Sequence, residues 1–177
     1  MLTVGHSTHP IEEFIGMLRA HGVELLVDVR TVPRSRYNPQ FGRDALPGSL
    51  EAAGIGYRHA PALGGLRRAR PDSVNTGWRN LNFRGFADYM LTPEFVAALE
   101  ELIGLSRQRR VTLMCAEAVP WRCHRSLIAD ALTVRGVAVE HIMSANARKP
   151  HVLTSFASVE GDEIIYTEEL SRRLPGL

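Results

Sequence analysis

The stretch LMCAEAVPWRCHRSLIADAL, residues 113–132, holds both cysteines of the chain together with a glutamate, a histidine and two arginines. Thiols, imidazoles and carboxylates are the groups that serve as nucleophiles, proton carriers and metal ligands. The stretch begins like a buried strand and ends with the spacing of an amphipathic helix, so these groups fall in the turn between them. Three explanations are open: a reactive site, a metal site, or chance placement.

Cys115 is the candidate nucleophile or redox centre. It closes a strand expected at 111–115 and faces a helix N-terminus and arginines, which would lower the pKa of its thiol. Glu117 opposes that effect through its negative charge, but it is itself a candidate, with His124, to move protons. The alternative is that Cys115 only completes a buried strand, since cysteine is among the most buried residue types.

Cys123, His124 and Arg125 are predicted to open a helix at about 122–135. Cys123 and Arg125 are candidates for binding an anion held by the helix amides, and the planar fork of Arg125 suits that role. His124 could instead be a polar cap that ties down the loop. The residue types also suit zinc, with His6 or Glu117 as a fourth ligand. Adjacent Cys-His ligands and the lack of C-x₂-C spacing argue against zinc, so no metal ligand and no cofactor is predicted.

Predicted strands alternate with predicted helices along the chain. The strands are expected at 2–7, 24–30, 55–63, 111–115 and 137–142, and the helices at about 10–22, 43–53, 84–91, 93–107 and 122–135. This order predicts an α/β fold, a three-layer sandwich with a mainly parallel sheet of about five strands and helices on both faces. Residues 1–150 are predicted to form a single α/β domain. Residues 151–177 are predicted to be a C-terminal extension packed on the same domain, with a hairpin around 160–162 and a short polar helix.

Polar residues follow the predicted strands. They are His6 and Ser7 after the first strand, Asp28 and Arg30 after the second, His59 near the end of the third, Cys115 and Glu117 after the fourth, and His141 near the end of the fifth. Parallel sheets bind ligands beyond the carboxyl ends of their strands. We therefore expect these side chains to converge on one edge of the sheet.

The residues predicted to bind an anionic substrate are His6, Ser7, Asp28, Arg30, Arg34, Ser35, Gly64, Gly65, Cys123 and Arg125. Arg30, with Arg34 and Ser35, could grip a phosphate. Asp28 and Arg30 could equally form a buried ion pair, and His6 and Ser7 could cap the first helix. The glycine pair is expected to allow a positive φ or a close backbone approach.

Residues 30–84 contain ten arginines and three acidic residues, a local balance of +7 in a chain of net charge +2. Arginine binds phosphate and carboxylate well, so the segment could be an anion-binding face; a genome that favours arginine codons would explain the choice of arginine over lysine but not the clustering. Four aromatic residues lie among these arginines, as in a stacking surface for bases: Tyr37, Phe41, Tyr57 and Trp78.

Five short motifs occur in this order along the chain: GHS at 5–7, DVR at 28–30, LGG at 63–65, CAE at 115–117 and CHR-x-x-IA at 123–129. Together they resemble the bacterial and archaeal domain-of-unknown-function 488 family over about residues 2–151. The resemblance implies an α/β domain in which these motifs matter, and it implies no reaction. The chain also resembles rhodanese-like sulfurtransferases at the level of the fold. In those proteins, too, DVR closes an early strand, and a later strand ends in cysteine before an arginine-containing loop and helix.

We predict from these features a cytoplasmic enzyme, a hydrolase or transferase, that acts on a phosphate-bearing substrate such as a nucleotide or nucleic-acid end. A binding module that grips nucleic acid through residues 30–84 is the first alternative, and a thiol redox sensor is the second. No secretory signal is expected at the start of the chain, and no apolar run approaches the roughly 20 residues of a membrane helix, so no membrane partner is predicted. The sequence favours no particular oligomeric state.

Overall fold

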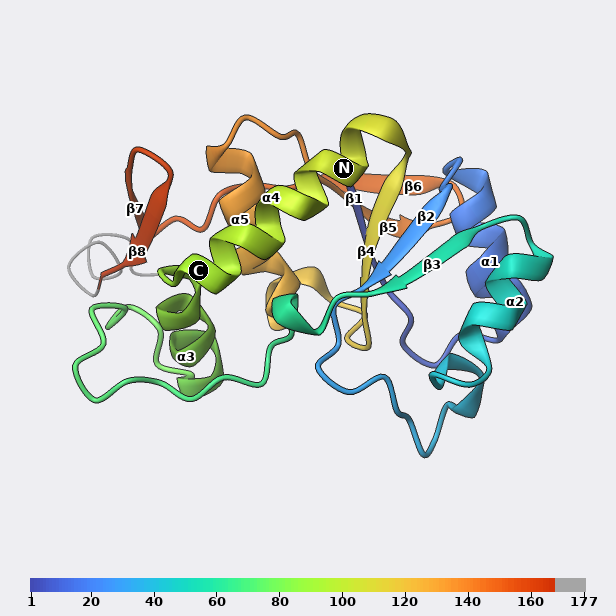
Figure 1. The fold of residues 1–177 in the computed structure, drawn as a ribbon, viewed down its shortest axis with the longest axis horizontal. Helices are drawn as coiled ribbons and strands as arrows, with labels where there is room; N and C mark the ends of the chain where they lie inside the picture. The colour runs from blue at the N-terminus through green and yellow to red at the C-terminus, as the bar shows by residue number, and fades with distance from the viewer. Residues whose placement is uncertain (168–177) are drawn as a thin grey trace.

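The computed structural model describes residues 1–167 and has an α/β architecture (Figure 1). The strands are β1 (Leu2–Gly5), β2 (Leu25–Asp28), β3 (Gly56–His59), β4 (Val111–Cys115), β5 (Glu140–Ser144), β6 (Ala147–Pro150), β7 (Ala157–Glu160) and β8 (Glu163–Tyr166). The α-helices are α1 (Ile11–Ala20), α2 (Leu46–Ala52), α3 (Leu81–Met90), α4 (Pro93–Gln108) and α5 (Arg125–Val134). Three 3-10 turns lie at Pro39–Phe41, Pro61–Leu63 and Pro120–Arg122. The short helix predicted for the tail lies outside the described residues.

One six-stranded sheet runs in the order β3-β2-β4-β1-β5-β6. The first five of these strands are parallel, which confirms the predicted α/β fold with a mainly parallel sheet. The sixth, β6, pairs antiparallel with β5 and was not predicted, because its residues ARKP are exposed and carry no apolar alternation.

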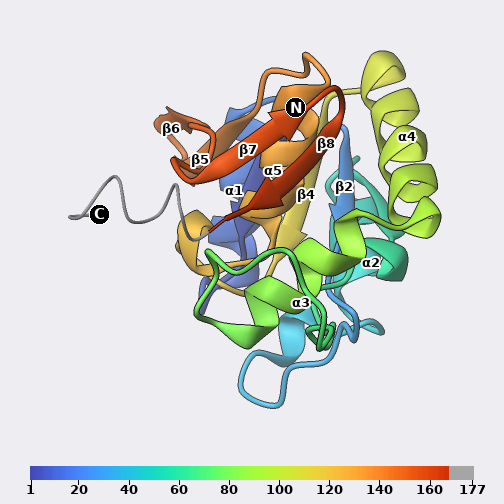
Figure 2. The same ribbon diagram turned by 90° about the vertical axis from the view of Figure 1, so that its left-hand side faces the viewer.

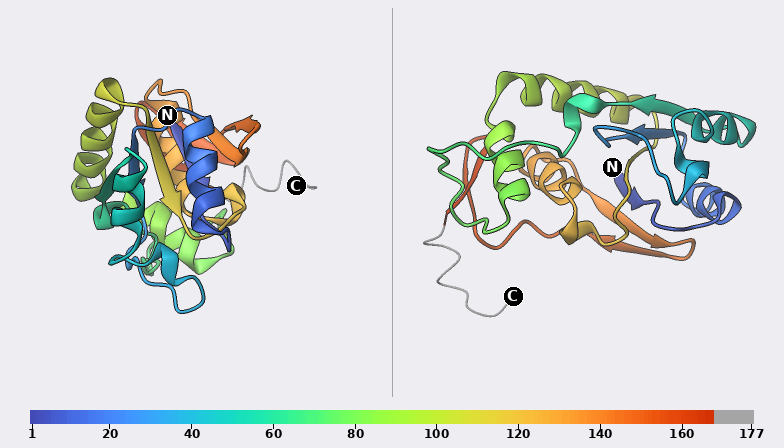
Figure 3. Two further views of the ribbon diagram at one scale, coloured as in Figure 1. Left: turned by 90° about the vertical axis from the view of Figure 1, so that its right-hand side faces the viewer. Right: turned by 90° about the horizontal axis from the view of Figure 1, so that it is seen from below.

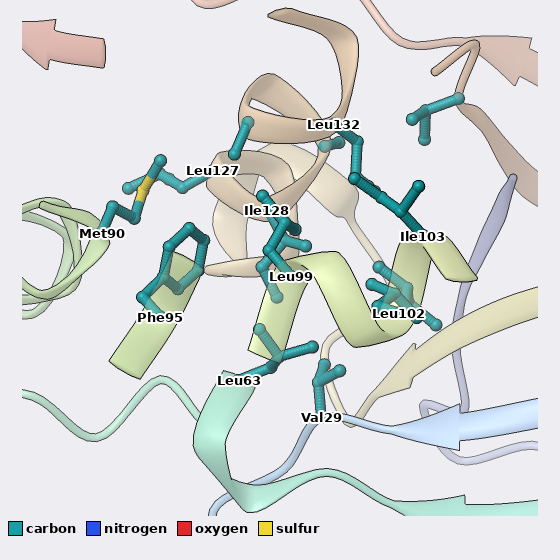
Figure 4. Close-up of a cluster of buried hydrophobic side chains, with 14 of the residues drawn as sticks. Val29, Leu63, Met90, Phe95, Leu99, Leu102, Ile103, Leu127, Ile128 and Leu132 are labelled. Carbon is teal, nitrogen blue, oxygen red and sulfur yellow. The ribbon is translucent and has the colours of Figure 1, made fainter. Parts of the chain in front are cut away.

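The central strands are buried on both faces, so alternate residues enter different cores. Leu25 and Val27 of β2 pack against α3, α4 and α5, whereas Leu26 packs against α1 and α2. Figures 1 and 3 show α1 and α2 together on one side of the sheet and the other three helices on the opposite side. The larger core, drawn in Figure 4, contains Leu99 of α4 and Ile128 of α5. This is the predicted three-layer sandwich.

The prediction that His141 lies near the carboxyl end of its strand is wrong, whereas His59 ends β3 as predicted. His141 is the second residue of β5 and pairs with Thr3 of β1, so three residues of β5 follow it before the carboxyl end of the strand. The strand begins later than expected, since the segment from Gly136, which has a positive φ, to Val139 is an irregular connection. His59 does end β3, but its Nε2 donates to the carbonyl of Arg30 at 2.9 Å and supports the loop after β2.

His141 belongs to a buried polar chain that runs to Asp130 of α5. His151 donates from Nε2 to Asp130 Oδ1 at 2.8 Å, and its Nδ1 forms a hydrogen bond with Nε2 of His141 at 3.1 Å. The Nδ1 of His141 forms a further hydrogen bond with the hydroxyl of Thr3 at 2.7 Å. Burial lowers the pKa of His141 to about 4, with His151 and Arg125 adding to the effect, so the His141 ring stays neutral.

Asp130 also holds the segment that follows β6. Its carboxylate accepts hydrogen bonds from the backbone and hydroxyl of Thr154 and from the hydroxyl of Tyr166, at 3.0, 2.7 and 2.8 Å. Figure 2 shows the β7–β8 hairpin crossing this end of the molecule near α3. None of the helices in residues 1–167 has the length and apolarity needed to span a bilayer.

Candidate active site at the carboxyl edge of the sheet

A pocket of about 730 Å³ opens where β1, β2 and β4 end. Ten of the thirteen predicted site residues line it: His6, Ser7, Arg30, Arg34, Ser35, Gly65, Cys115, Glu117, Cys123 and His124. The parallel register explains this convergence, since Gly5 pairs with Cys115, and Asp28 pairs with Met114 on the other side of β4.

The loop after β4 lies directly across the end of β1. The backbone amides of His6 and Ser7 donate to the carbonyls of Cys115 and Ala116 at 2.9 and 3.0 Å, which extends the ladder beyond the strands. A Cβ on Gly5 would collide with the carbonyl of Glu117, so only glycine allows this approach. Ser7 has a φ of 48°, and it is the one non-glycine residue of 1–167 with a positive φ. Such a backbone costs about 1–3 kcal/mol and marks functional sites.

Arg30 is held rigidly on one side of the pocket. It donates to both carboxylate oxygens of Asp28, at 2.8 and 2.6 Å, to the carbonyl of Phe41 and to Nε2 of His6. These contacts occupy four of its five N–H groups, and one N–H of Nη1 remains for a ligand. Asp28 is fully buried and lies outside the pocket wall, where it also accepts from Tyr57. It therefore positions Arg30 and does not itself face a substrate.

His6 is a neutral acceptor that completes this arrangement. Its Nδ1 donates to the carbonyl of Ser7 at 2.9 Å, which leaves Nε2 free to accept from Arg30. Burial lowers the pKa of His6 to about 4, and the ring stacks on Phe41 at 4.2 Å. Since both ring nitrogens are engaged, His6 is not available as the fourth zinc ligand considered from the sequence.

Cys115, Cys123 and His124 form a cluster on the floor of the pocket, and their ligand atoms all lie within 4.8 Å of one another. Both cysteines are free thiols. A hydrogen bond from the Cys123 thiol, helped by His124, holds the pKa of Cys115 well below its usual value. The interaction with Cys115 and burial raise the pKa of Cys123, so Cys115 is the more acidic of the two thiols.

His124 is fixed in one orientation by three neighbours. Its Nε2 lies 3.2 Å from the carbonyl of Val29 and must carry the proton, which leaves Nδ1 directed at the sulfur of Cys123, 3.7 Å away. Phe86 packs edge-on against the ring. Gly65 leaves room for the ring, because a Cβ there would overlap Nδ1. This explains the role of Gly65 as a close approach; its neighbour Gly64 packs on Thr31 and does not line the pocket.

Replacing Gly65 by alanine is expected to displace the His124 ring and to lower the free energy of unfolding by about 1–3 kcal/mol, the usual cost of overpacking. Gly16→Ala is the matched control, since a Cβ there meets nothing within 4 Å and an alanine inside α1 should be neutral or stabilising by up to about 1 kcal/mol. Urea denaturation of both variants tests the contact. Equal stabilities would show that the ring is not constrained by Gly65.

Arg125 does not face the pocket as the sequence suggested. Its side chain is fully buried beneath the loop after β4, where Nη2 donates to the carbonyl of Ala118 at 2.9 Å. Its Nε and Nη1 have no hydrogen-bond partner among residues 1–167. Its positive charge interacts with Cys123, Cys115 and Glu117. Arg125 is therefore a buried positive charge behind the cluster rather than a fork for substrate.

Half of the arginines in the arginine-rich segment interact with other residues of the protein. Five of its ten arginines make ion pairs or side-chain hydrogen bonds within the described chain: Arg30, Arg58, Arg67, Arg70 and Arg84. Three of the four aromatic residues among these arginines pack against other parts of the protein. Phe41 and Tyr57 pack in the Arg30 network and Trp78 packs among Phe83, Phe156 and Tyr166, whereas Tyr37 alone of the four is exposed.

The pocket wall includes polar residues that sequence reasoning did not select. Arg122 belongs to the Pro120–Arg122 turn, and Asn80 and Asn82 stand at the beginning of α3. The signal for the two asparagines was the Asn-rich run WRNLNF in an otherwise irregular segment. Arg122 sits between the two cysteines, but nothing in its spacing distinguishes it from a solvent-exposed arginine.

Comparison with known proteins assigns the chain to a family but to no particular activity. No curated protein and no solved structure matches the chain significantly, so the fold similarity to rhodanese-like sulfurtransferases is not shown. The model of one family, Domain of unknown function DUF488, matches residues 10–132, which is more than half of the chain and includes the entire cluster. The chain therefore belongs to the DUF488 family.

Proposed function

We propose that this protein is an enzyme, a hydrolase, that acts on a phosphate-bearing substrate in the pocket at the carboxyl edge of the sheet. The observation that carries the proposal is the position of the Cys115–Cys123–His124 cluster, on the floor of a pocket whose wall contains three arginines and one glutamate. A reactive group and an anion-binding surface thus share one cavity.

The anion-binding part of the pocket contains one arginine whose side chain is held in place and two whose side chains are free to move. Arg30 is buried and oriented by Asp28, with one N–H left for a ligand. Arg34 and Arg122 are exposed at the wall and can adjust to the substrate. Such pre-oriented guanidinium groups bind phosphate oxygens with little loss of entropy.

Glu117 is the proposed proton carrier. It lines the pocket two residues after Cys115, and its Oε1 accepts from the backbone amide of Val119 at 3.3 Å, which holds the carboxylate in place. A carboxylate beside a reactive centre can take a proton from water and return it to a leaving group. The proposal places the protein in the cytoplasm, where the two free thiols would stay reduced.

The proposal predicts that Arg34→Ala lowers kcat/KM by about 10–100-fold, the loss of one charge-assisted hydrogen bond of about 1.5–3 kcal/mol. The assay is a panel of nucleotides, oligonucleotides and sugar phosphates, with product formation followed by chromatography. Arg36→Ala is the control, since Arg36 is exposed two residues away but does not line the pocket. Equal losses in the two variants, or no turnover by wild-type protein of any phosphorylated compound, would overturn the proposal.

A nucleic-acid-binding module without chemistry gives a different result in the same experiment. Nonspecific binding through surface arginines falls steeply with salt and depends on each exposed arginine to a similar degree. Arg34→Ala and Arg36→Ala would then weaken oligonucleotide binding alike, and loss of Glu117 would leave binding unchanged. The internal pairing of five of the ten arginines makes this second candidate weaker.

A further inference from the structure

We infer that Cys115, Cys123 and His124 bind one Zn²⁺ ion, whose fourth coordination position is open to the pocket and holds the water that the enzyme uses. The inference rests on the proposed function for its catalytic part, but the metal site can be tested without any substrate. The sequence argument against zinc was that adjacent Cys-His ligands are awkward. The fold removes that objection, because the three ligand atoms come together within 4.8 Å.

The separation between the sulfur of Cys123 and Nδ1 of His124 fits zinc. Bonds of about 2.3 Å to sulfur and 2.0–2.1 Å to nitrogen at a tetrahedral angle place the two atoms about 3.6 Å apart. The Sγ of Cys123 and the Nδ1 of His124 are 3.7 Å apart. Two thiolates and one imidazole are also a soft donor set, which suits zinc and not magnesium, calcium or manganese.

The orientation of His124 is that of a metal ligand. Metal-bound histidines donate their other ring N–H to a carboxylate or backbone carbonyl, which fixes the tautomer. Nε2 of His124 has the carbonyl of Val29 at 3.2 Å, and Nδ1 faces the sulfurs with an unshared electron pair. The absence of a side chain at Gly65 keeps that side of the ring open.

The charges around the cluster fit two thiolates. Arg125 is 1 % exposed, and two of its three nitrogens lack a hydrogen-bond partner in residues 1–167. An unpaired buried cation is costly unless negative charge lies close by. A zinc ion with Cys115 and Cys123 as thiolates is electrically neutral, so Glu117 remains as the formal counter-charge of Arg125.

An open fourth position distinguishes a catalytic zinc site from a structural one. His6 cannot fill it, because both of its ring nitrogens are engaged. The carboxylate of Glu117 lines the pocket but is not one of the three clustered donors, so it is placed to act on a bound water.

Hydrolysis at this site needs only the substrate and one water molecule. Glu117 takes one proton from the zinc-bound water, and the resulting hydroxide forms a bond to the electrophilic atom of the substrate. The bond from that atom to the leaving group breaks with its electron pair. The leaving group takes the proton from Glu117, which restores the carboxylate.

The test is the metal content of the purified full chain, measured by plasma mass spectrometry after dialysis against metal-free buffer. We expect one zinc per chain in the wild type, in Glu117→Gln and in His9→Ala, whose histidine lies on the surface beside Glu13. The Cys115→Ser, Cys123→Ser and His124→Ala variants are each expected to bind zinc more than ~100-fold more weakly, since even residues behind the ligands change affinity by about 10–100-fold.

A second measurement uses only unmutated protein, in case the variants fail to fold. Chelator-treated wild-type protein is reduced and titrated with Co²⁺, and we expect a thiolate-to-cobalt charge-transfer band that Zn²⁺ abolishes. Absence of both zinc and that band would overturn the inference, as would zinc retained in the Cys115→Ser variant. Formation of a Cys115–Cys123 disulfide by mild peroxide in metal-free wild-type protein that does not bind Co²⁺ would identify a thiol redox pair instead.

The two proposals fail in different ways. If the protein binds zinc but turns over no phosphorylated compound, the metal site is supported and the proposed function is contradicted. If turnover persists after a chelator has removed all metal, the enzymatic function is supported and a catalytic role for zinc is contradicted.

Discussion

Glu117→Gln is expected to lower kcat by about 100–10,000-fold while leaving the fold and the zinc content unchanged. General acid-base groups contribute rate factors of this size, and glutamine cannot take a proton from water at neutral pH. The amide oxygen of glutamine can still accept from the amide of Val119, as Oε1 of Glu117 does. The loop after β4 should therefore keep its position, so that a loss of rate reports on proton transfer.

Glu51→Gln is the matched control for this prediction. Glu51 is exposed on α2, outside the pocket wall, and its replacement also removes one negative charge. Both proteins are compared in kcat and in KM for the best substrate of the panel, and in zinc content. If Glu117→Gln keeps more than about a tenth of the wild-type kcat, Glu117 is not the proton carrier, and a merely electrostatic effect of Glu117 would appear in KM instead.

Much of the fold was predictable because the physical signals are local. The apolar runs of β2 and β4 are typical of strands covered on both faces, and the stripe of Phe95, Leu99 and Ile103 is typical of a helix packed on a sheet. Once the strands are parallel, their carboxyl ends must share an edge, so Arg30 and Cys115 meet although 84 residues separate them.

The wrong predictions concern properties that depend on tertiary packing. Arg125 precedes the apolar stripe of α5 by one turn whether its side chain faces the pocket or the interior. Only the path of the loop formed by residues 116–119 decides between the two, and the side chain lies buried beneath that loop. His141 was misplaced because the start of β5 is set by its pairing with β1 and not by its own residues. The spacing along the chain also did not reveal that Cys115, Cys123 and His124 form a cluster, which depends on the path of the Pro120–Arg122 turn.

The buried carboxylate of Asp130 leads to the second large expected effect. Asp130→Ala should lower the free energy of unfolding by about 3–5 kcal/mol, the usual result of removing one partner from a buried charged network. The side chain is fully buried and accepts four hydrogen bonds, from His151, from Tyr166 and twice from Thr154. The donors are buried or half-buried and would lose their acceptor. Asp44→Ala, at an exposed site, should change stability by less than about 0.5 kcal/mol.

A double-mutant cycle separates this network from simple loss of packing. Tyr166→Phe removes one hydroxyl donor to Asp130 and should cost about 1–2 kcal/mol in wild-type protein. In the Asp130→Ala background the same change should cost nearly nothing, because the hydroxyl has no carboxylate left to bind. Urea denaturation of the four proteins gives a coupling free energy of about 1 kcal/mol or more if the contact is formed. Additive effects would mean that Asp130 stabilises α5 by itself and does not hold residues 151–166 on the domain.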